Sequence, residues 1–405
     1  MKVCVLDSSI AAVILLLLIS CGSRPVNKES LATDNIEMST LTSFGIDLFK
    51  HILQIEGNTG EILISPLSAS AALGMLAVGA QGETREQIVK TLGLNADISD
   101  KDLLMYYQHL FTIFPFTDTT TLSLANAVWW SYPLKNNYVK TTESVFKAHL
   151  EEVDFANAKS AALIINNWTA DKTRNRILEI VTETDVHNAG LVLENALFFN
   201  SPWKDREPLQ TRNLHYNAIN GKRDKRPFVY ASLKNISYFS DDTVSVVRIP
   251  YQDNKYCLVV ALPKCNYIDF ITSLNNDNWT EWRKRSTAED IELRIPCFQK
   301  EYKMDNTFQT ALKNKGMILP FTPFADFSNM LSSNVYNISR IIQKCNIKVD
   351  EQGTEAAAAT VTVIEITSPM NVKDTKTYFI ADHPFIFAVE NRQTGDLLMI
   401  GTHCY

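Results

Sequence analysis

The sequence contains none of the short motifs by which most enzymes and cofactor-binding proteins are recognised. It has no Gly-x-Ser-x-Gly nucleophile motif, no His-Glu-x-x-His zinc motif, no phosphate-binding loop and no dinucleotide-binding glycine pattern. The two glycines of Gly79–Thr84 lack the Gly-Lys-Ser/Thr ending of a phosphate loop and instead predict a helix end and a turn. The 7 histidines are scattered without metal-ligand spacing. We therefore expect neither enzymatic activity nor a bound metal or cofactor.

The chain also lacks an excess of positive charge and any linker-like tract. Its net charge of -6 gives no support for binding to nucleic acid or to an anionic membrane surface, because either would call for a basic patch. No proline-rich, glycine-serine or single-sign charge tract divides the 405 residues, and no repeat recurs at solenoid spacing. With 45% hydrophobic residues, the composition predicts a single domain with a large core.

Cysteine is sparse, and no Cys-x-x-Cys pair occurs among the 7 cysteines. Removal of the N-terminal segment discussed below would leave Cys257, Cys265, Cys297, Cys345 and Cys404. An odd number leaves at least one thiol unpaired within the chain. A core of this size does not need disulfides, so we expect most of these cysteines to be small buried apolar side chains.

The N-terminus carries an apolar run, Ile10–Ile19, that is too short to span a bilayer. Lys2 precedes it and small residues follow, which is typical of a signal peptide. We predict a signal peptide over residues 1–22, followed by a single domain over residues 23–405 and secretion to the extracellular space. The sequence Leu18–Cys21 leaves a bacterial lipoprotein signal as the alternative.

Asn-x-Ser/Thr sequons support the prediction of a secreted glycoprotein. Their asparagines are Asn167, Asn235, Asn278 and Asn337. The alternative is that some of these sequons occur by chance and are never modified.

Hydrophobic periodicity predicts helices early in the chain and strands late. Apolar residues recur at helical spacing over Leu41–Ile52, and Ser65–Ala80 begins with a cap-like serine and a proline before an almost wholly apolar run. Residues 255–264, 385–390 and 397–405 are rich in apolar β-forming residues. This distribution predicts an α+β fold.

One segment carries contradictory local signals. Glu351–Thr360 contains four consecutive alanines, which favour helix, yet Val361–Thr367 follows directly with β-branched residues that favour strand. No turn residue separates the two stretches.

Ordered sequence blocks show that the chain resembles the serpins, and the resemblance covers essentially the whole mature sequence. The blocks are Ile64–Ile88, Leu124–Trp129, Leu191–Lys204, Ile249–Pro263, Phe324–Met330, Val349–Thr360 and Phe379–Phe387. The resemblance implies helices packed around three β-sheets, with an exposed, mobile reactive-centre loop at about residues 351–378.

The resemblance also implies suicide inhibition of a serine protease. The protease would attack the loop and form a covalent acyl-enzyme, and the cleaved loop would then enter the main sheet as a new strand and distort the tethered enzyme. The competing interpretation is a non-inhibitory serpin that acts as a carrier or storage protein.

The contradictory segment corresponds to the hinge of that loop. By resemblance the hinge comprises Glu351, Gly353, Thr354, Glu355, Ala356, Ala357, Ala358, Ala359 and Thr360. In a strand, Thr354, Ala356 and Ala358 would share one uncharged face, whereas Glu355 would lie on the other. Small side chains on the buried face favour rapid insertion, because larger ones would displace packed neighbours at about 1–3 kcal/mol each.

Counting from the hinge glutamate, as the family's spacing implies, places the reactive bond at Thr367–Ser368. Counting back from Asp382–Phe385 with the family's shortest spacing gives Lys373–Asp374, and Met370–Asn371 is a further alternative. A small neutral Thr367 favours an elastase-like protease, whereas Lys373 would favour a trypsin-like one.

The resemblance also assigns residues to the opening of the sheet. Ser65, Ser68, Asn195 and Gln343 match a polar cluster beneath its centre, and Trp203 matches the tryptophan near the insertion point. Gln343 departs from the usual histidine, so its hydrogen bonds must differ.

The helix that binds heparin in several serpins matches Lys101–Phe111, which contains one lysine and no basic stripe. We therefore expect no heparin cofactor there. We expect a monomer whose partner is the target protease.

Overall fold

The computed structural model describes residues 40–114, 122–204, 209–331, 338–354 and 376–405. Its helices within these ranges are α1 (Thr40–Ile55), α2 (Pro66–Gly79), α3 (Gly82–Thr91), α4 (Asp100–Ile113), α5 (Asn136–Phe146), α6 (Ala158–Lys172), α7 (Glu183–Val186), α8 (Tyr267–Ser273), α9 (Asn276–Lys284), α10 (Asn306–Asn314) and a 3₁₀ turn, η2 (Leu319–Phe321).

The described strands form one sheet of seven strands and one of nine. The seven-stranded sheet contains β3 (His149–Glu152), β2 (Leu122–Trp130), β4 (Leu191–Phe199), β12 (Arg340–Asp350), β13 (Gly353–Thr354) and β5 (Ser201–Pro202) in that order, with β11 (Phe298–Met304) paired to β12. The nine-stranded sheet contains β1 (Leu63–Ile64), β16 (Leu397–His403), β15 (Phe385–Asn391), β9 (Tyr256–Pro263), β8 (Val244–Pro250), β7 (Arg223–Ser240), β10 (Thr287–Pro296) and β14 (Thr377–Ile380) in that order, with β6 (Gln210–Asn217) paired to β7.

The α+β arrangement predicted from the sequence is confirmed, but hydrogen bonding joins two of the three expected sheets into one. Strand β7 is 18 residues long and takes part in both of them. Its first half pairs with β6, and its last residues, Ser237–Ser240, pair with β8. Between these parts Asn235 has a positive φ of 53° and β10 shifts register after Glu289. The bend redirects the strand without ending it, so one ladder runs through both sheets.

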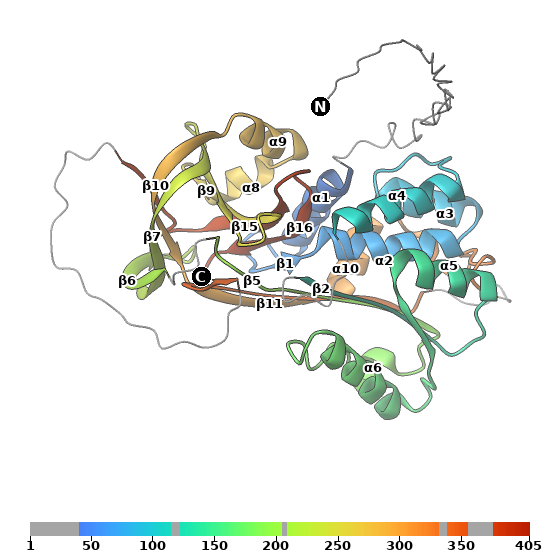
Figure 1. Cartoon of the computed structure of the whole chain (residues 1–405). Coiled ribbons are helices and arrows are strands. Elements are labelled where there is room, and N and C mark those ends of the chain that lie inside the picture. Colours follow the sequence, from blue (N-terminus) through green and yellow to red (C-terminus); the bar gives the residue numbers. More distant parts are fainter. Residues whose placement is uncertain (1–39, 115–121, 205–208, 332–337, 355–375) are drawn as a thin grey trace, which may run out of the picture.

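The seven-stranded sheet is covered on both faces (Figure 1). Helices α2, α4 and α5 lie on one side of it and α6 on the other. Almost every residue of α2 is buried, consistent with a helix that is apolar on all sides. Helix α6 presents a narrower apolar face, and its Ala161 and Ile165 belong to one buried apolar cluster with Ala196 of β4.

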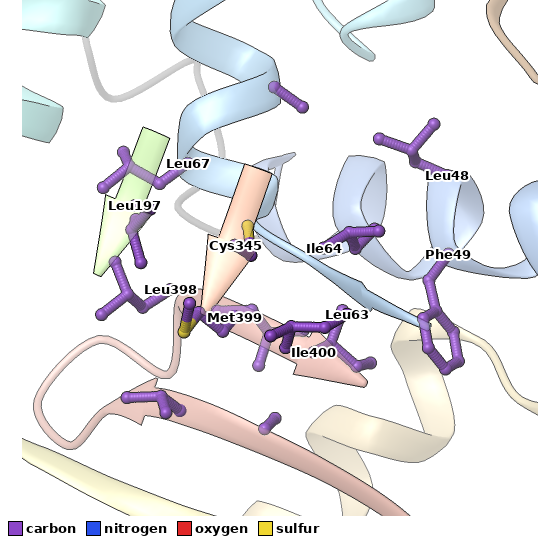
Figure 2. Packing of buried hydrophobic residues seen from close by; sticks show 14 of the residues in the cluster. Leu48, Phe49, Leu63, Ile64, Leu67, Leu197, Cys345, Leu398, Met399 and Ile400 are labelled. Carbon is purple, nitrogen blue, oxygen red and sulfur yellow. The ribbon is translucent and has the colours of Figure 1, made fainter. Parts of the chain in front are cut away.

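The larger core lies between the seven-stranded sheet, α2 and the nine-stranded sheet. Leu67 of α2, Leu197 of β4, Cys345 of β12 and Met399 of β16 belong to one apolar cluster (Figure 2). This cluster explains how strands far apart in the sequence are fixed against one helix.

Local sequence signals account for the elements that they predicted. Helix α1 covers the periodic stretch, and Ser65 caps α2 by accepting a hydrogen bond from the Ser68 N–H at 3.1 Å. The late apolar runs form β9, β15 and β16.

All five cysteines of the described chain are unpaired. Cys257, Cys345 and Cys404 are buried, as expected of small apolar side chains, whereas Cys265 is exposed and Cys297 is half-buried. Within the described ranges no helix has the length and apolar character needed to cross a membrane.

Candidate functional site

A row of polar side chains crosses the centre of the seven-stranded sheet on the face toward α2. Asn126 of β2 lies opposite Asn195 of β4, and Asn195 lies opposite Gln343 of β12. All three are almost completely buried. Residues opposite one another on neighbouring strands share a face, so the three amides lie side by side in an otherwise apolar layer.

Gln343 connects this row to the start of α2. Its Oε1 accepts the Ser65 N–H at 2.9 Å, and its Nε2 donates to the Ser65 carbonyl at 3.0 Å. The departure from histidine is therefore accommodated by an amide that binds both main-chain groups of Ser65. The predicted pair Ser65 and Gln343 is brought together.

The other two members of the predicted cluster, Asn195 and Ser68, form no side-chain hydrogen bond with Gln343. Asn195 donates to Asn126 Oδ1, and Asn126 donates to the Phe146 carbonyl at 3.1 Å. Ser68 Oγ and Asn195 Oδ1 have no hydrogen-bond partner among the described residues. A buried polar atom without a partner costs about 1–3 kcal/mol. The centre of the sheet is therefore locally under-satisfied.

Asn126 was missed by the sequence interpretation. The signal for it was an asparagine in the middle of the apolar strand Leu122–Trp130, where a polar residue requires a buried partner.

The first residues of the predicted hinge lie between two strands. Gly353–Thr354 forms β13, which pairs antiparallel with β12 on one side and with β5 on the other. Below this point β12 and β4 pair directly and in parallel, from Arg340 opposite Val192 to Asn346 opposite Phe198. At one end of the sheet β13 thus lies between β12 and β5, whereas along the centre β12 pairs directly with β4.

Position 353 requires glycine. Its φ is +147°, and a Cβ atom built on it would lie 2.4 Å from the Ser201 carbonyl oxygen. The close approach lets β13 fit between its neighbours.

An aromatic pair holds Thr354, the second residue of β13. The rings of Trp203 and Tyr251 stack with centroids 5.2 Å apart and planes at 4°. Trp203 Nε1 donates to the Asp350 carbonyl at 2.9 Å, and the Tyr251 hydroxyl forms a hydrogen bond with the Thr354 hydroxyl. Thr354 is completely buried. Trp203 therefore contacts the end of β12 beside β13. Its partner Asp350 lies seven residues along β12 from Gln343, roughly 23 Å away at strand rise.

Glu351, the first residue of the predicted hinge, lies in the turn between β12 and β13. Its carbonyl accepts the Leu209 N–H at 2.9 Å, and its Oε2 accepts the Thr211 hydroxyl at 3.3 Å. These contacts hold the turn against the strand that follows β5.

A buried carboxyl lies on the opposite face of β4, beneath α6. Glu194 accepts hydrogen bonds from Trp129 Nε1 at 2.8 Å and from the Thr169 hydroxyl of α6. Removal from water raises the pKa of Glu194 to about 7, although both hydrogen bonds act in the opposite direction. This carboxyl links α6 to the central strand.

Many predicted site residues lie outside the described residues. They are Glu355, Ala356, Ala357, Ala358, Ala359, Thr360, Thr367, Ser368, Met370, Asn371, Lys373, Asp374 and Asn337. Of the other sequon asparagines, Asn167 and Asn235 are exposed, whereas Asn278 is half-buried and completes the capping box of α9. No cluster of three or more His, Cys, Asp or Glu side chains that could hold a metal ion occurs in the described ranges.

Comparison with known proteins agrees with this architecture. The model of the serpin (serine protease inhibitor) family matches residues 39–405. A leukocyte elastase inhibitor of Xenopus laevis is 31% identical over 90% of this chain and 98% of its own length. An uncharacterised serpin-like protein of Thermococcus kodakarensis is 30% identical over 94% of this chain and 89% of its own.

Among solved structures, the native state of tengpin, a thermophilic serpin, superposes with a TM-score of 0.78 at 27% identity. That comparison covers 92% of this chain and 95% of tengpin. With a family match over nearly its whole length and the same fold, the chain belongs to the serpin family.

Proposed function

We propose that this protein is a suicide inhibitor of serine proteases, in which the cleaved loop inserts between β12 and β4. Serpins include many protease inhibitors, and this chain is similar to several of them. The single observation that carries the proposal is β13, because its two residues already have the position and direction of an entering strand.

The register of β13 defines where each further hinge residue would go. Thr354 lies opposite Val349 and Gly353 opposite Asp350. Continued without a bulge, the same register would place Ala358 opposite Cys345 and Thr360 opposite Gln343. Insertion would thus replace the direct pairing of β12 with β4.

This register places uncharged side chains toward the core. Val349, Ile347, Cys345 and Gln343 of β12 face the larger core and are buried. Their partners would be Thr354, Ala356, Ala358 and Thr360, all small and uncharged. Glu355 would instead lie opposite Lys348 on the other face, an opposite-charge pair that favours the register. The alternation therefore supports an insertion-competent hinge.

Insertion of the loop needs a source of free energy besides its own hydrogen bonds. New ladder hydrogen bonds contribute about 0.5–1.5 kcal/mol each, whereas ordering a residue costs about 1–2 kcal/mol. Hydrogen bonding alone does not drive insertion. Asn195, whose Oδ1 is unpartnered, lies opposite Gln343, where Thr360 would arrive, and the Thr360 hydroxyl would supply a new donor and acceptor there.

We further propose an elastase-like target cleaved at Thr367–Ser368, consistent with the similarity to leukocyte elastase inhibitors. Secretion after loss of residues 1–22, N-glycosylation, a monomeric state and independence from heparin remain part of the proposal.

The test is incubation of the purified protein with elastase-, chymotrypsin-, trypsin- and subtilisin-like proteases. A covalent complex stable in denaturing gels supports inhibition. Mass spectrometry then identifies the released C-terminal peptide: a start at Ser368 supports the assigned bond, and a start at Asn371 or Asp374 moves it. Cleavage by every protease without a complex would favour the carrier or storage function.

A further inference from the structure

A cavity of about 480 Å³ lies against the nine-stranded sheet, apart from the central polar row. Strands β7, β8 and β10 and the end of α9 contribute its walls, and Trp203 closes it on the side of the hinge. Its volume is within the range of small-molecule sites, about 300–1,000 Å³.

The charge of the cavity wall contrasts with the net negative charge of the chain. Five lining residues are basic and one, Glu390, is acidic. The basic residues are Lys204, Lys234, Arg248, Arg283 and Arg392.

The negative charge of Glu390 is already balanced by neighbouring arginines. Arg248 Nε donates to Glu390 Oε1 at 3.3 Å, and Trp279 Nε1 donates to Oε2 at 3.1 Å. Arg283 Nε lies 3.6 Å from Oε1. Glu390 therefore has no charge left to balance the remaining cations of the wall.

Arg248 also has a donor that no described residue satisfies. The side chain is 6% exposed, its Nη1 donates to Ser286 Oγ at 3.1 Å, and its Nη2 has no acceptor within the described chain. A buried guanidinium donor without an acceptor is costly. An anion in the cavity beside Arg248 would offset the charge of this buried guanidinium.

The other part of the wall is apolar. Leu233 and Ile249 are buried side chains that line the cavity together with the indole of Trp203. A ligand that fits both parts has an apolar body and one anionic group.

We propose that this cavity binds a small amphipathic organic anion, an aromatic or aliphatic group that carries a carboxylate, sulfonate or sulfate. The anionic group lies toward the cations near Arg248 and Arg392, and the apolar body lies against Leu233, Ile249 and Trp203. This binding does not depend on whether the reactive loop inhibits a protease.

The test measures binding of 8-anilino-1-naphthalenesulfonate to the intact protein by fluorescence titration. N-phenyl-1-naphthylamine, which has the same aromatic body without the sulfonate, is the neutral control ligand. The protein is produced without N-glycans, because Asn235, a predicted glycosylation site, lines the cavity.

The variant Lys234→Gln/Arg392→Gln removes two exposed cations from the wall. Lys222→Gln/Lys225→Gln removes two exposed cations from the hairpin of β6 and β7 and is the charge-matched control. Neither pair contributes to the core, and thermal melting verifies that both variants fold.

We expect the sulfonate to bind about tenfold more weakly to the cavity variant and within about twofold of wild type to the control. The neutral ligand should bind wild type at least about tenfold more weakly than the sulfonate and should not distinguish the variants. Equal loss in both variants, no loss in the cavity variant, equal binding of the two ligands, or no binding of the sulfonate would each overturn the proposal.

Discussion

Gln343 and Ser65, 278 residues apart in the sequence, are joined by two hydrogen bonds that use both polar atoms of one amide. The Gln343 amide pairs with the Ser65 main chain at the point where α2 begins. The contact fixes the central strand β12 to the core helix, and Gln343 is also the residue that would face the inserted Thr360.

Substitution of Gln343 by alanine should therefore destabilise the native state. Gln343→Ala leaves the buried Ser65 N–H without its acceptor and should lower the free energy of unfolding by about 1–3 kcal/mol. Gln299→Ala, on the exposed edge of β11, is the control and should change it by less than about 0.5 kcal/mol. Urea unfolding measures both, and equal effects would refute the role assigned to Gln343.

Gly353→Ala should displace β13. The new Cβ atom would meet the Ser201 carbonyl oxygen at 2.4 Å, and main chain cannot move aside as a flexible side chain can. Gly221→Ala also has a positive φ, 78°, but its Cβ would meet nothing within 4 Å. We expect Gly353→Ala to cost at least about 1 kcal/mol more than Gly221→Ala, which carries only a backbone cost of about 1–2 kcal/mol. Similar melting temperatures for the two variants would show that β13 is not held closely between its neighbours.

Glu194 should make stability depend on pH. Burial raises its pKa from 4.5 to about 7, so the folded state holds the proton more tightly than the unfolded state does. The resulting stabilisation is fully present below about pH 4.5 and is lost as pH rises through about 7, a loss of about 3 kcal/mol. Glu194→Gln carries no titrating proton and removes this loss.

The measurement is urea unfolding of wild type and Glu194→Gln at pH 5 and pH 8. We expect the variant to gain stability relative to wild type between the two pH values. A difference between the two proteins that does not change with pH would contradict the assignment. Glu179→Gln, an exposed carboxyl elsewhere on the chain, controls for a general charge effect.

Substitutions on the two faces of the predicted hinge should have different effects on covalent complex formation. Ala358→Arg would place a cation opposite Cys345 on the apolar core face of the inserted strand. Ala357→Arg would lie on the other face, opposite Asn346, whose side chain donates to the Glu301 carboxylate. A buried unpaired charge is strongly unfavourable. We expect Ala358→Arg to be cleaved as a substrate and Ala357→Arg to retain most covalent complex formation. Loss of complex in both variants, or in neither, would be inconsistent with the proposed register.

The sequence was sufficient for features that depend on local pattern. The capped start of α2 and the apolar strands β9, β15 and β16 follow from side-chain periodicity and the cap residue. The family resemblance predicted a hinge that begins near Glu351 and a polar cluster that includes Ser65 and Gln343, which the structure brings together. These signals depend on neighbouring residues and on blocks in a fixed order.

Other features depend on contacts between distant segments, which local pattern does not encode. The bend at Asn235, which lets β7 join two sheets, depends on its partners in β8 and β10. The buried Glu194 reads in the sequence as an ordinary charged residue within a strand, and only the packing of α6 shows that it is enclosed. The Tyr251–Thr354 contact joins residues 103 positions apart.

The most direct test of the insertion mechanism is a crystal structure of the protein after cleavage of its reactive loop. We expect a new strand between β12 and β4 that continues the register of β13, with Ala358 opposite Cys345 and Thr360 opposite Gln343. Direct pairing of Arg340–Asn346 with Val192–Phe198, unchanged from the intact protein, together with a loop outside the sheet, would contradict it.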